Sequence, residues 1–409
     1  MKTNYTPIQT TTSTSGTLTP EAICTLVRSL HPGQPPISLH RPVFSAVEKA
    51  YLSKCIDSNF VSSLGAYVDE FERRLAELAG VHRAVATVNG TAALHLSLLS
   101  LGVTADTEVI TQPITFAATT NAIGYLGAVP HFVDVERQTM GMSPEALEAY
   151  LTEKTEIRHG ACHNRDTGRR ISACLPVHVY GHPCRMEEIA ELCRRYRIPL
   201  VEDAAEALGS YRGGVHVGRH GVVSTLSFNG NKIITTGGGG AVLTNDRALA
   251  DRIKHLSTTA KTPHPWEYFH DELGYNYRLP NLNAALGCAQ LEQLPWFLEE
   301  KRKLAGAYEE FFSGSDIEFV REPEGCRSNY WLNAVLFPDR GRRDDFLAYS
   351  NSNGVMTRPL WTLMTDLPAF AEAPCEAIPV ARDLVERVVA LPSGVPGPAY
   401  VQIPGGGTK

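Results

Sequence analysis

A lysine stands between an apolar strand and a run of glycines in the segment LSFNGNKIITTGGGG. The predicted strand ends at Phe228, Lys232 follows in a turn-rich stretch, and four glycines begin at Gly237. Such a turn lets an amine project into a cleft, and glycines let the backbone pass close to a bulky group. A lone lysine is most often a solvated surface charge. This one has no charged neighbour, and a lysine withdrawn from water is the usual Schiff-base former, so the segment predicts a nucleophilic amine.

Two adjacent carboxylates, Glu202 and Asp203, close the apolar run IPLVEDA. In open α/β sheets, ligands bind beyond the carboxyl ends of the strands. A carboxylate buried there needs a cation or strong hydrogen bonds, because otherwise it takes up a proton. A protonated pyridine nitrogen would be such a cation. The competing interpretation is that Asp203 caps a following helix, AAEAL, and the segment alone favours the cap.

A strand–glycine–helix junction lies in VNGTAALHL, where Asn89 can cap a helix and Gly90 precedes Thr91 and Ala92. Free backbone N–H groups and the helix dipole converge at such a junction and form a phosphate site. An ordinary capped helix is the alternative, and taken alone it is the better interpretation. The chain contains neither G-x-G-x-x-G nor a Gly-Lys dipeptide, so it has no dinucleotide fingerprint and no P-loop.

A fourth polar segment is LGYNYRLPNLNAALG, in which two tyrosines flank Asn276 and Arg278 precedes a helix that opens near Pro280. It is either a loop that presents amide and guanidinium groups or a plain loop-to-helix transition. The residues alone do not separate these two interpretations.

The elements that must position these residues alternate short apolar runs with helical patterns from Leu39 to about Asn245. Strands are predicted at 83–88, 108–112, 129–135, 171–179, 198–204, 223–228 and 240–245, and helices at 91–101 and 114–126. Near-continuous apolar strands that alternate with helices predict an α/β fold with a mostly parallel sheet covered on both faces. The polar residues 155–170 are expected to form a surface loop.

Four regions are expected along the chain. Residues 1–38 form a polar arm and a short helix (PEAICTLVRSL), and 39–280 form a large α/β domain. Helices over 281–312, interrupted at Pro295, lead to a smaller α+β domain at 313–409, with strands in NYWLNAVLFP and GVMTRPLWT and a flexible tail.

Composition excludes several classes of function. The 409 residues are 43% apolar and 20% charged, with a net charge of −6 and a pI near 6.2, which offers no basic face to nucleic acid or an anionic membrane. No apolar run approaches the roughly 18 residues of a membrane span, and no signal peptide is expected. The nine cysteines are never spaced C-x-x-C, which favours reduced thiols in the cytoplasm. Cys184 near His182 falls short of the about four ligands that a structural metal site needs, so no metal is expected.

The four segments occur together and in this order, and they resemble the signature of the sugar-nucleotide aminotransferases of the DegT/StrS group. These are fold-type I enzymes that depend on pyridoxal 5′-phosphate, and the resemblance runs from about Leu39 to Pro392. It implies a set of cofactor-binding residues, each at a family motif: Gly90, Thr91, Ala92 and Ser227 at the phosphate, Phe116 stacked on the ring, Asp203 at the pyridine nitrogen, Glu206 near the ring hydroxyl, and Lys232 as the covalent attachment point. Asn276 reaches the partner subunit's site in that family, which implies a homodimer with shared active sites.

Two departures from the family pattern concern the substrate. The usual G-E-G-G is G-G-G-G from Gly237 to Gly240, and Glu206 stands where glutamine or histidine is common. With TTAKTPHPWEYFHDELGYNYR and GVMTRPLWTLM, they resemble the branch that aminates UDP-linked 4-keto-6-deoxy-N-acetylhexosamines for legionaminic acid and related bacterial surface sugars, such as those of lipopolysaccharide O-antigen. The expected amino donor is glutamate. Arg358 and Trp361 are the expected polar and stacking contacts to the nucleotide.

Three alternatives remain at this stage. A nicotinamide-dependent oxidoreductase of nucleotide sugars would share the alternation of strands and helices, but the missing glycine fingerprint counts against it. In the pyridoxal-phosphate-dependent sugar dehydratases of the same fold, histidine replaces the lysine, whereas Lys232 is present. An inactive regulator of the family is disfavoured because both Lys232 and Asp203 are intact.

Overall fold

The structure is a computed structural model that describes residues 16–33 and 36–395. Most of the predicted polar arm and the whole of the predicted C-terminal tail from Val401 lie outside these residues. No helix within the described residues is both long and apolar enough to cross a membrane.

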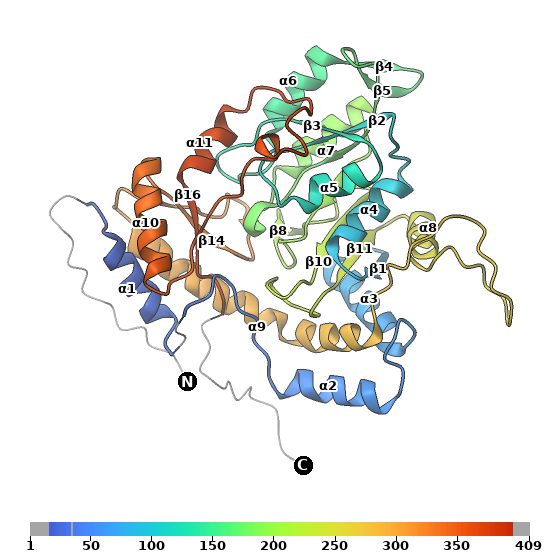
Figure 1. The fold of residues 1–409 in the computed structure, drawn as a ribbon, viewed down its shortest axis with the longest axis horizontal. Helices are drawn as coiled ribbons and strands as arrows, with labels where there is room; N and C mark the ends of the chain where they lie inside the picture. The colour runs from blue at the N-terminus through green and yellow to red at the C-terminus, as the bar shows by residue number, and fades with distance from the viewer. Residues whose placement is uncertain (1–15, 34–35, 396–409) are drawn as a thin grey trace.

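The central sheet is mostly parallel, as predicted. It contains strands β1 (Arg83–Thr87), β11 (Gly240–Thr244), β10 (Val223–Ser227) and β7 (Val201–Asp203), in that order. Parallel bridges at Cys174–Leu200 and Val177–Asp203 join β7 to β6 (Arg170–Leu175), which continues to β2 (Thr107–Thr111) and β3 (Val129–Phe132). Among these strands, β11 is antiparallel to its neighbours, β1 on one side and β10 on the other. β1, β10 and β7 therefore run in the same direction, so their carboxyl ends lie at one edge of the sheet; β1 and β10 are labelled in Figure 1.

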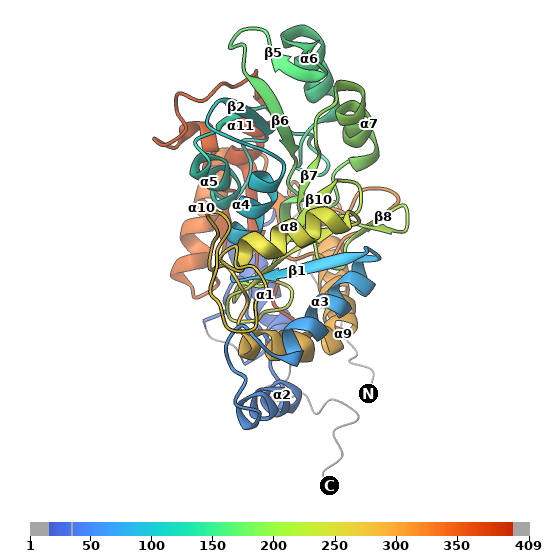
Figure 2. The same ribbon diagram turned by 90° about the vertical axis from the view of Figure 1, so that its right-hand side faces the viewer.

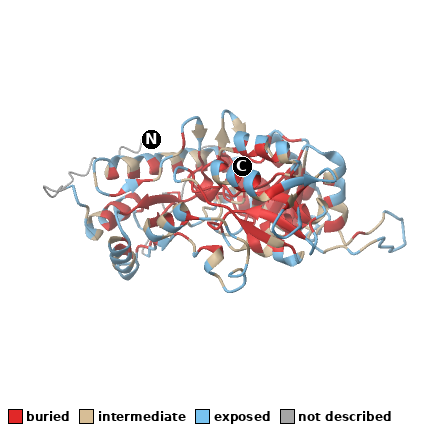
Figure 3. Ribbon diagram, turned by 90° about the horizontal axis from the view of Figure 1, so that it is seen from above, coloured by how far each residue is buried: buried red, intermediate tan, exposed pale blue. Residues whose placement is uncertain are grey.

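Both faces of this sheet are covered. Along β1, Ala84 and Ala86 face a core that includes α3 (Ala66–Ala79), whereas Val85 faces a core that includes α4 (Gly90–Ser100) and α8 (Arg247–Ser257). Successive side chains on a strand point to opposite faces, so an apolar run is the expected sequence for a strand buried on both sides. α3 and α8 lie on either side of β1 in Figure 2, and the buried residues concentrate along the central strands in Figure 3.

The prediction of a surface loop at 155–170 is wrong for the residues that form strands. The chain there forms a hairpin of β4 (Thr155–Arg158) and β5 (Ala161–Asn164), and β5 pairs with β6. The Asn164 side chain donates a hydrogen bond of 2.9 Å to the buried carboxylate of Glu108 on β2. Pairing at the sheet edge and this buried contact fold a segment whose polar composition alone indicates a loop.

A second, antiparallel sheet has the order β12 (Glu318–Phe319), β14 (Asn333–Leu336), β16 (Val388–Leu391) and β15 (Arg358–Pro359). Helices α10 (Arg340–Ser352) and α11 (Pro379–Arg387) follow its strands, and the predicted N-terminal helix, α1 (Pro20–Leu30), packs against α10. β14 and β15 are shorter than the predicted strands. The remaining elements are α2 (Ala46–Asp57), α5 (Ala118–Tyr125), α6 (Pro144–Lys154), α7 (Met186–Tyr196), the short strands β8 (Tyr211–Arg212), β9 (Val215–His216) and β13 (Cys326–Arg327), and the 3₁₀ turns η1 (Val179–Gly181) and η2 (Met364–Asp366).

A single helix, α9 (Asn281–Phe312), connects the two sheets, and the predicted interruption at Pro295 is wrong. Proline removes one intrahelical hydrogen bond and crowds the preceding turn. Packing outweighs that local penalty. α2 and α3 cover the first half of α9 (Figure 1), and Leu304 and Tyr308 are buried in the second half.

Candidate active site

The N-terminus of α4 and the end of β10 form one small polar cradle. The Asn89 side chain caps α4 by accepting a hydrogen bond of 2.7 Å from the backbone N–H of Ala92. A Cβ atom added at Gly90 would come within 3.0 Å of the Ser227 Cβ and 3.3 Å of its Oγ, so a larger residue would require the Ser227 side chain to shift. Thr91, in the first turn of α4, and Ser227 therefore lie at a helix N-terminus whose first N–H groups have no partner inside the helix. This arrangement suits a phosphate group.

Asp203 ends β7 and is buried, and its carboxylate has specific partners. One oxygen accepts a hydrogen bond of 2.7 Å from the Thr119 hydroxyl, and the other accepts one of 3.1 Å from the backbone N–H of Ala205. Burial raises the pKa of Asp203, and the hydrogen bond from Thr119 opposes that rise. Turns follow Asp203 instead of the helix AAEAL, so the cap interpretation fails. A cation placed against this carboxylate would offset the burial.

The neighbouring Glu202 faces away from Asp203 and binds the main chain. One of its oxygens accepts hydrogen bonds from the backbone N–H groups of His220 and Gly221, and the other accepts from Gly218 and lies 3.2 Å from His178 Nε2. Burial acts to raise the pKa of Glu202, but the hydrogen bond with His178 and the backbone donors hold it below its usual value. Glu202 thus fixes a loop.

Lys232 lies beside two groups that attract a cation. Its Nζ atom is 3.3 Å from Glu206 Oε1 and 4.0 Å from the centroid of the Trp331 ring. The other Glu206 oxygen accepts a hydrogen bond of 2.9 Å from the backbone N–H of Tyr180. Burial raises the pKa of Glu206, and the Lys232 charge opposes that rise, as it does for Asp203. The Lys232 amine and the carboxylates of Glu206 and Asp203 thus form one electrostatic group.

The other predicted residues differ in how they relate to this group. Phe116 is 60% exposed and begins the turn that carries Thr119, the partner of Asp203. Trp361 packs on Tyr180 with ring centroids 5.1 Å apart, which brings it next to the Glu206 contact. Arg358 lies on exposed β15 and donates to Asn351 Oδ1 at 3.0 Å, apart from the group around Lys232.

Asn276 lies in the exposed segment between α8 and α9. Its side-chain oxygen accepts hydrogen bonds from Arg278 at 3.1 and 3.3 Å. The backbone N–H of Val88 donates to the Tyr277 carbonyl at 2.8 Å, so the segment runs past the end of β1. Within the described chain, Asn276 contacts Arg278 and not Lys232 or Asp203.

Sequence reasoning missed four residues of this site: Thr119, Tyr180, Asn329 and Trp331. Tyr180 occupies the left-handed region at φ 56°, which is uncommon for a bulky residue and occurs at functional sites. The Asn329 side chain donates to the Glu206 and Leu208 carbonyls, both at 2.9 Å. Thr119 follows Phe116 by three residues in the segment ITFAAT and could have been chosen with it. No local pattern marks Asn329 or Trp331.

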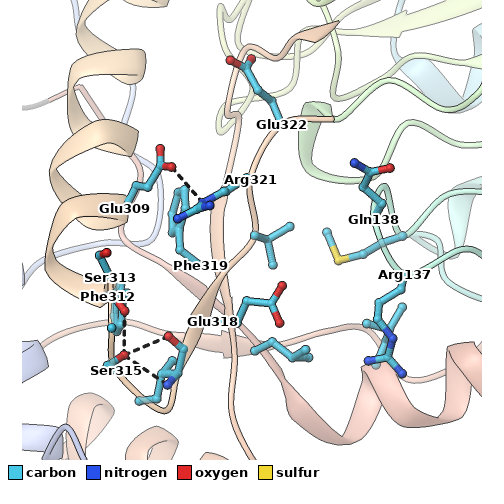
Figure 4. A pocket seen from close by; sticks show the side chains of 16 residues that line it. Arg137, Gln138, Glu309, Phe312, Ser313, Ser315, Glu318, Phe319, Arg321 and Glu322 are labelled. Atoms are coloured by element: carbon cyan, nitrogen blue, oxygen red, sulfur yellow. Dashed lines mark hydrogen bonds and ion pairs between the residues drawn. The ribbon is translucent and has the colours of Figure 1, made fainter. Parts of the chain in front are cut away.

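A separate hollow of about 570 Å³ lies between the β3–α6 connection and the β12 segment. Arg137, Gln138, Glu309, Glu318 and Arg321 are among the residues that line it, and an Arg321–Glu309 ion pair crosses one side (Figure 4). None of the predicted site residues lines this hollow.

The model of the DegT/DnrJ/EryC1/StrS aminotransferase family matches residues 43–396. The chain belongs to this family. The DegT-family aminotransferases depend on pyridoxal phosphate, and their fold-type I architecture is the one described above. The predicted family, fold and cofactor are therefore confirmed.

Two curated proteins and one solved structure illustrate what this DegT-family chain is similar to. GDP-perosamine synthase of Escherichia coli O157:H7 is 39% identical over 87% of this chain and 93% of its own length. The putative pyridoxal phosphate-dependent aminotransferase EpsN of Bacillus subtilis strain 168 is 38% identical over 88% and 91%. Among solved structures, the aminotransferase TlmJ of Streptoalloteichus hindustanus superposes with a TM-score of 0.79, at 28% identity, over 87% of this chain and 93% of its own.

The residues of the site fit pyridoxal phosphate. The cradle at Gly90 and Ser227 suits the phosphate, since a helix N-terminus and the Ser227 hydroxyl lie together there. The buried Asp203 carboxylate, whose pKa burial raises, suits a protonated pyridine nitrogen. The Lys232 amine contacts Glu206 at 3.3 Å and its charge acts on Asp203, which suits one ligand bound among the three groups.

Proposed function

We propose that this enzyme transfers an amino group to the keto carbon of a nucleotide-linked 4-keto-6-deoxy sugar, with glutamate as the donor. We further propose that the sugar carries a 2-acetamido group and is linked to UDP. The observation that carries the aminotransfer proposal is the contact of 3.3 Å between Lys232 and Glu206, in the same group as the buried Asp203.

Each residue of the site has a proposed role. Thr91, Ser227 and the backbone N–H groups of Gly90 and Ala92 would bind the phosphate, which would replace the Asn89 side chain as the acceptor of the Ala92 N–H. Phe116 would cover the ring, Asp203 would contact the pyridine nitrogen, and Glu206 would contact the ring hydroxyl. Pyridoxal phosphate, when bound, supplies an electron sink for the carbon that loses its proton. Lys232 attaches the cofactor, and once freed it moves the proton at the carbon that bears the nitrogen, first for glutamate and then for the sugar. Asp203 keeps the ring nitrogen protonated.

The nucleotide sugar is proposed to bind on the side of the second sheet. Trp361 packs on Tyr180, whose N–H binds Glu206, so an aromatic surface adjoins the reacting centre. The relative from Escherichia coli is named for a GDP-linked sugar, and UDP is proposed here from the run TTAKTPHPWEYFHDELGYNYR and from GVMTRPLWTLM. A uracil-sized pocket rejects guanine by steric overlap. A site that binds an acetamido group keeps unpaired polar atoms when a hydroxyl replaces it.

We also propose that the enzyme is a homodimer with shared active sites. The segment between α8 and α9 projects from the body (Figure 1), and its Trp266 and Tyr268 are 77% and 80% exposed. A groove of about 650 Å³ at the base of this segment is lined by Leu64, Lys254, Lys261 and Arg278 among others. Large exposed apolar side chains around a groove are typical of an interface. A second copy that covers this groove would meet Asn276.

The substrate proposal is tested by kcat/KM for UDP-, dTDP- and GDP-linked 4-ketosugars, each with and without the 2-acetamido group. We expect the UDP sugar with the acetamido group to be preferred. Loss of that group should reduce kcat/KM by roughly four orders of magnitude, whereas a size mismatch alone gives about two. Preference for a GDP sugar with a free 2-hydroxyl would overturn the substrate proposal and leave the aminotransfer proposal intact.

A further inference from the structure

We propose that Trp331 is a positioning residue that holds the Lys232 amine in the orientation required for the chemical step. The inference rests on the proposed role of Lys232, and it concerns a residue that the sequence placed only in a predicted strand, NYWLNAVLFP. The centroid of the Trp331 ring lies 4.0 Å from Lys232 Nζ, and the Lys232 side chain is 11% exposed. An ammonium at this distance over an indole face is attracted by the ring quadrupole.

Trp331 is itself held from several directions. Its ring N–H donates a hydrogen bond of 2.6 Å to the carbonyl of Asn231, the residue before Lys232, so the indole binds the loop that carries the amine. Its backbone N–H donates to Asn329 Oδ1 at 2.8 Å, and its carbonyl accepts from Lys301 Nζ at 3.2 Å. Trp331 is only 4% exposed. A side chain fixed at both ends in this way is a rigid surface.

One side chain links this surface to the acid of the site. Asn329 accepts from the backbone of Trp331 and donates to the backbone carbonyl of Glu206 at 2.9 Å. The indole and the carboxylate that contact Lys232 are therefore held by the same residue. Any shift of the segment around Asn329 moves both contacts together.

The two contacts restrict the amine differently. The Glu206 oxygen attracts the ammonium from one direction but leaves the flexible four-carbon stem of Lys232 free to swing around it. The Trp331 face removes much of that freedom, because it covers the amine over a flat area and excludes water there. Orientation of a reacting group affects the chemical step more than it affects substrate binding. Trp331 thus acts through Lys232 and need not touch the substrate.

The first test uses cofactor-free protein, so it does not depend on the proposed reaction. Lys232 is labelled competitively with acetic anhydride, and its labelling is read by peptide mass spectrometry relative to the exposed Lys49. We expect Trp331→Leu and Trp331→Met to raise Lys232 labelling by about tenfold, whereas Trp331→Phe, which keeps an aromatic face, raises it less than about threefold. Trp296→Leu, which alters a half-buried tryptophan of α9 that packs on Phe297, is the matched control and should leave labelling unchanged.

The buried Lys301 reports local unfolding, because it can be labelled only if the surrounding structure opens. It should stay unlabelled in every variant used. If the leucine variant does not fold, the methionine variant makes the same comparison with a longer side chain. Lys232 labelling that is unchanged in a folded leucine or methionine variant would overturn the proposal.

The second test uses the enzyme loaded with its cofactor. In single turnovers with glutamate, the leucine and methionine variants should lose about tenfold or more in the maximal rate with less than about threefold change in half-saturation, and phenylalanine should restore most of the rate. Equal losses in the phenylalanine and leucine variants would contradict positioning by the aromatic face. If the parent enzyme showed no reaction with glutamate, the proposed function would fail, while the labelling result would still decide the role of Trp331.

Discussion

The Lys232 amine and the Glu206 carboxylate are 3.3 Å apart, and the Lys232 and Glu206 side chains are only 11% and 4% exposed. Two charges withdrawn from water interact more strongly than a surface pair, but each loses hydration that the partner must replace. The Tyr180 N–H supplies a second hydrogen bond to Glu206, and the Trp331 face supplies a second contact to Lys232. The protein without its cofactor thus contains its own counter-ion for the amine.

A double-mutant cycle should detect this pair. Glu206→Gln, Lys232→Met and the double variant are compared by denaturant unfolding of the cofactor-free protein at pH 7. We expect Lys232→Met to lower the free energy of unfolding, because it leaves Glu206 buried without a counter-ion. Glu206→Gln should change it less, because burial raises the pKa of Glu206 and its ionisation at pH 7 opposes folding. The coupling energy between the two changes should be about 1–3 kcal/mol. Lys303→Met, which removes a surface pair with Glu300, should change the free energy of unfolding by less than about 1 kcal/mol. Additive effects of the first two changes would show that the pair contributes nothing.

Lys232 should be the point of attachment. Reduction of the cofactor-loaded enzyme with borohydride should fix the cofactor to the peptide that contains Lys232, as read by mass spectrometry. Lys232→Ala should abolish turnover but still bind pyridoxamine phosphate, because the phosphate cradle is intact. The buried Lys301 is the alternative attachment point to exclude, since burial lowers its pKa to about 7. It is held by the carbonyls of Trp331 and Ser393, so we expect no label there.

Removing the charge of Asp203 should affect mainly the chemical step, whereas removing the charge of Glu202 should affect mainly the stability of the fold. Asp203→Asn should slow the chemical step by about 10³-fold or more, on the order of several kcal/mol, because the ring nitrogen loses its partner. The same change should not lower the free energy of unfolding of the cofactor-free protein at pH 7. The raised pKa of Asp203 means that holding it ionised at that pH opposes folding.

Glu202→Gln is the matched control. The pKa of Glu202 is lowered in the fold, so its charge stabilises the protein above the usual carboxyl pKa, and that contribution is lost as pH falls. The glutamine variant should therefore lose about 1–3 kcal/mol of stability at pH 7 with a smaller effect on the chemical step. Equal rates for the two variants would contradict the proposed role of Asp203.

The local motifs were predictable because each sits at the end of a buried strand. Ligands bind beyond the carboxyl ends of parallel strands, which agrees with the positions of Gly90, Asp203 and Ser227, but the resemblance to the family was needed to assign the three residues to one site. The direction of the Glu202 and Asp203 side chains was not predictable in this way. β7 is short and buried on both faces, so its apolar pattern does not reveal which acid faces the site.

Trp331 was not predictable because its position depends on packing. Asn231, which accepts its ring hydrogen bond, lies 100 residues away in the chain. Only the placement of α9 and the second sheet brings the two together. Pro295 shows the same limit, since its local penalty is real but the packing of α9 outweighs it.

Lys301 should make stability depend on pH. Burial lowers its pKa from the usual 10.5 to about 7, so between these values the unfolded chain binds more protons than the folded one. The free energy of unfolding should therefore rise with pH across that window, by on the order of a few kcal/mol from this group, and the penalty is fully present below about pH 7. The free energy of unfolding is measured for the cofactor-free parent and for Lys301→Met at pH 7 and pH 9.5, under reducing conditions. The difference between the two proteins isolates the contribution of Lys301 to the pH dependence. The same pH dependence in both proteins would show that Lys301 is not the cause.

Asn276 should complete the active site of the partner subunit. In its own chain it is exposed and binds Arg278, away from Lys232. Lys232→Ala and Asn276→Ala chains are mixed under conditions that exchange subunits, and the single-turnover rate with glutamate is measured. If sites are shared, each mixed dimer has one site with both Lys232 and Asn276. Random mixing then restores up to about a quarter of all sites, because half of the dimers are mixed.

The control for this experiment pairs Lys232→Ala with Asp203→Asn. Both residues lie in the same group within one chain, so no arrangement of these two chains gives an intact site, and activity should not return. If Asn276 acts only within its own subunit, the first mixture behaves like the control, because the chain that keeps Lys232 lacks Asn276. Activity that fails to return despite mixed dimers shown by native mass spectrometry would exclude shared sites, as would an Asn276→Ala enzyme as active as the parent. Recovery in the first mixture alone would place Asn276 across the interface.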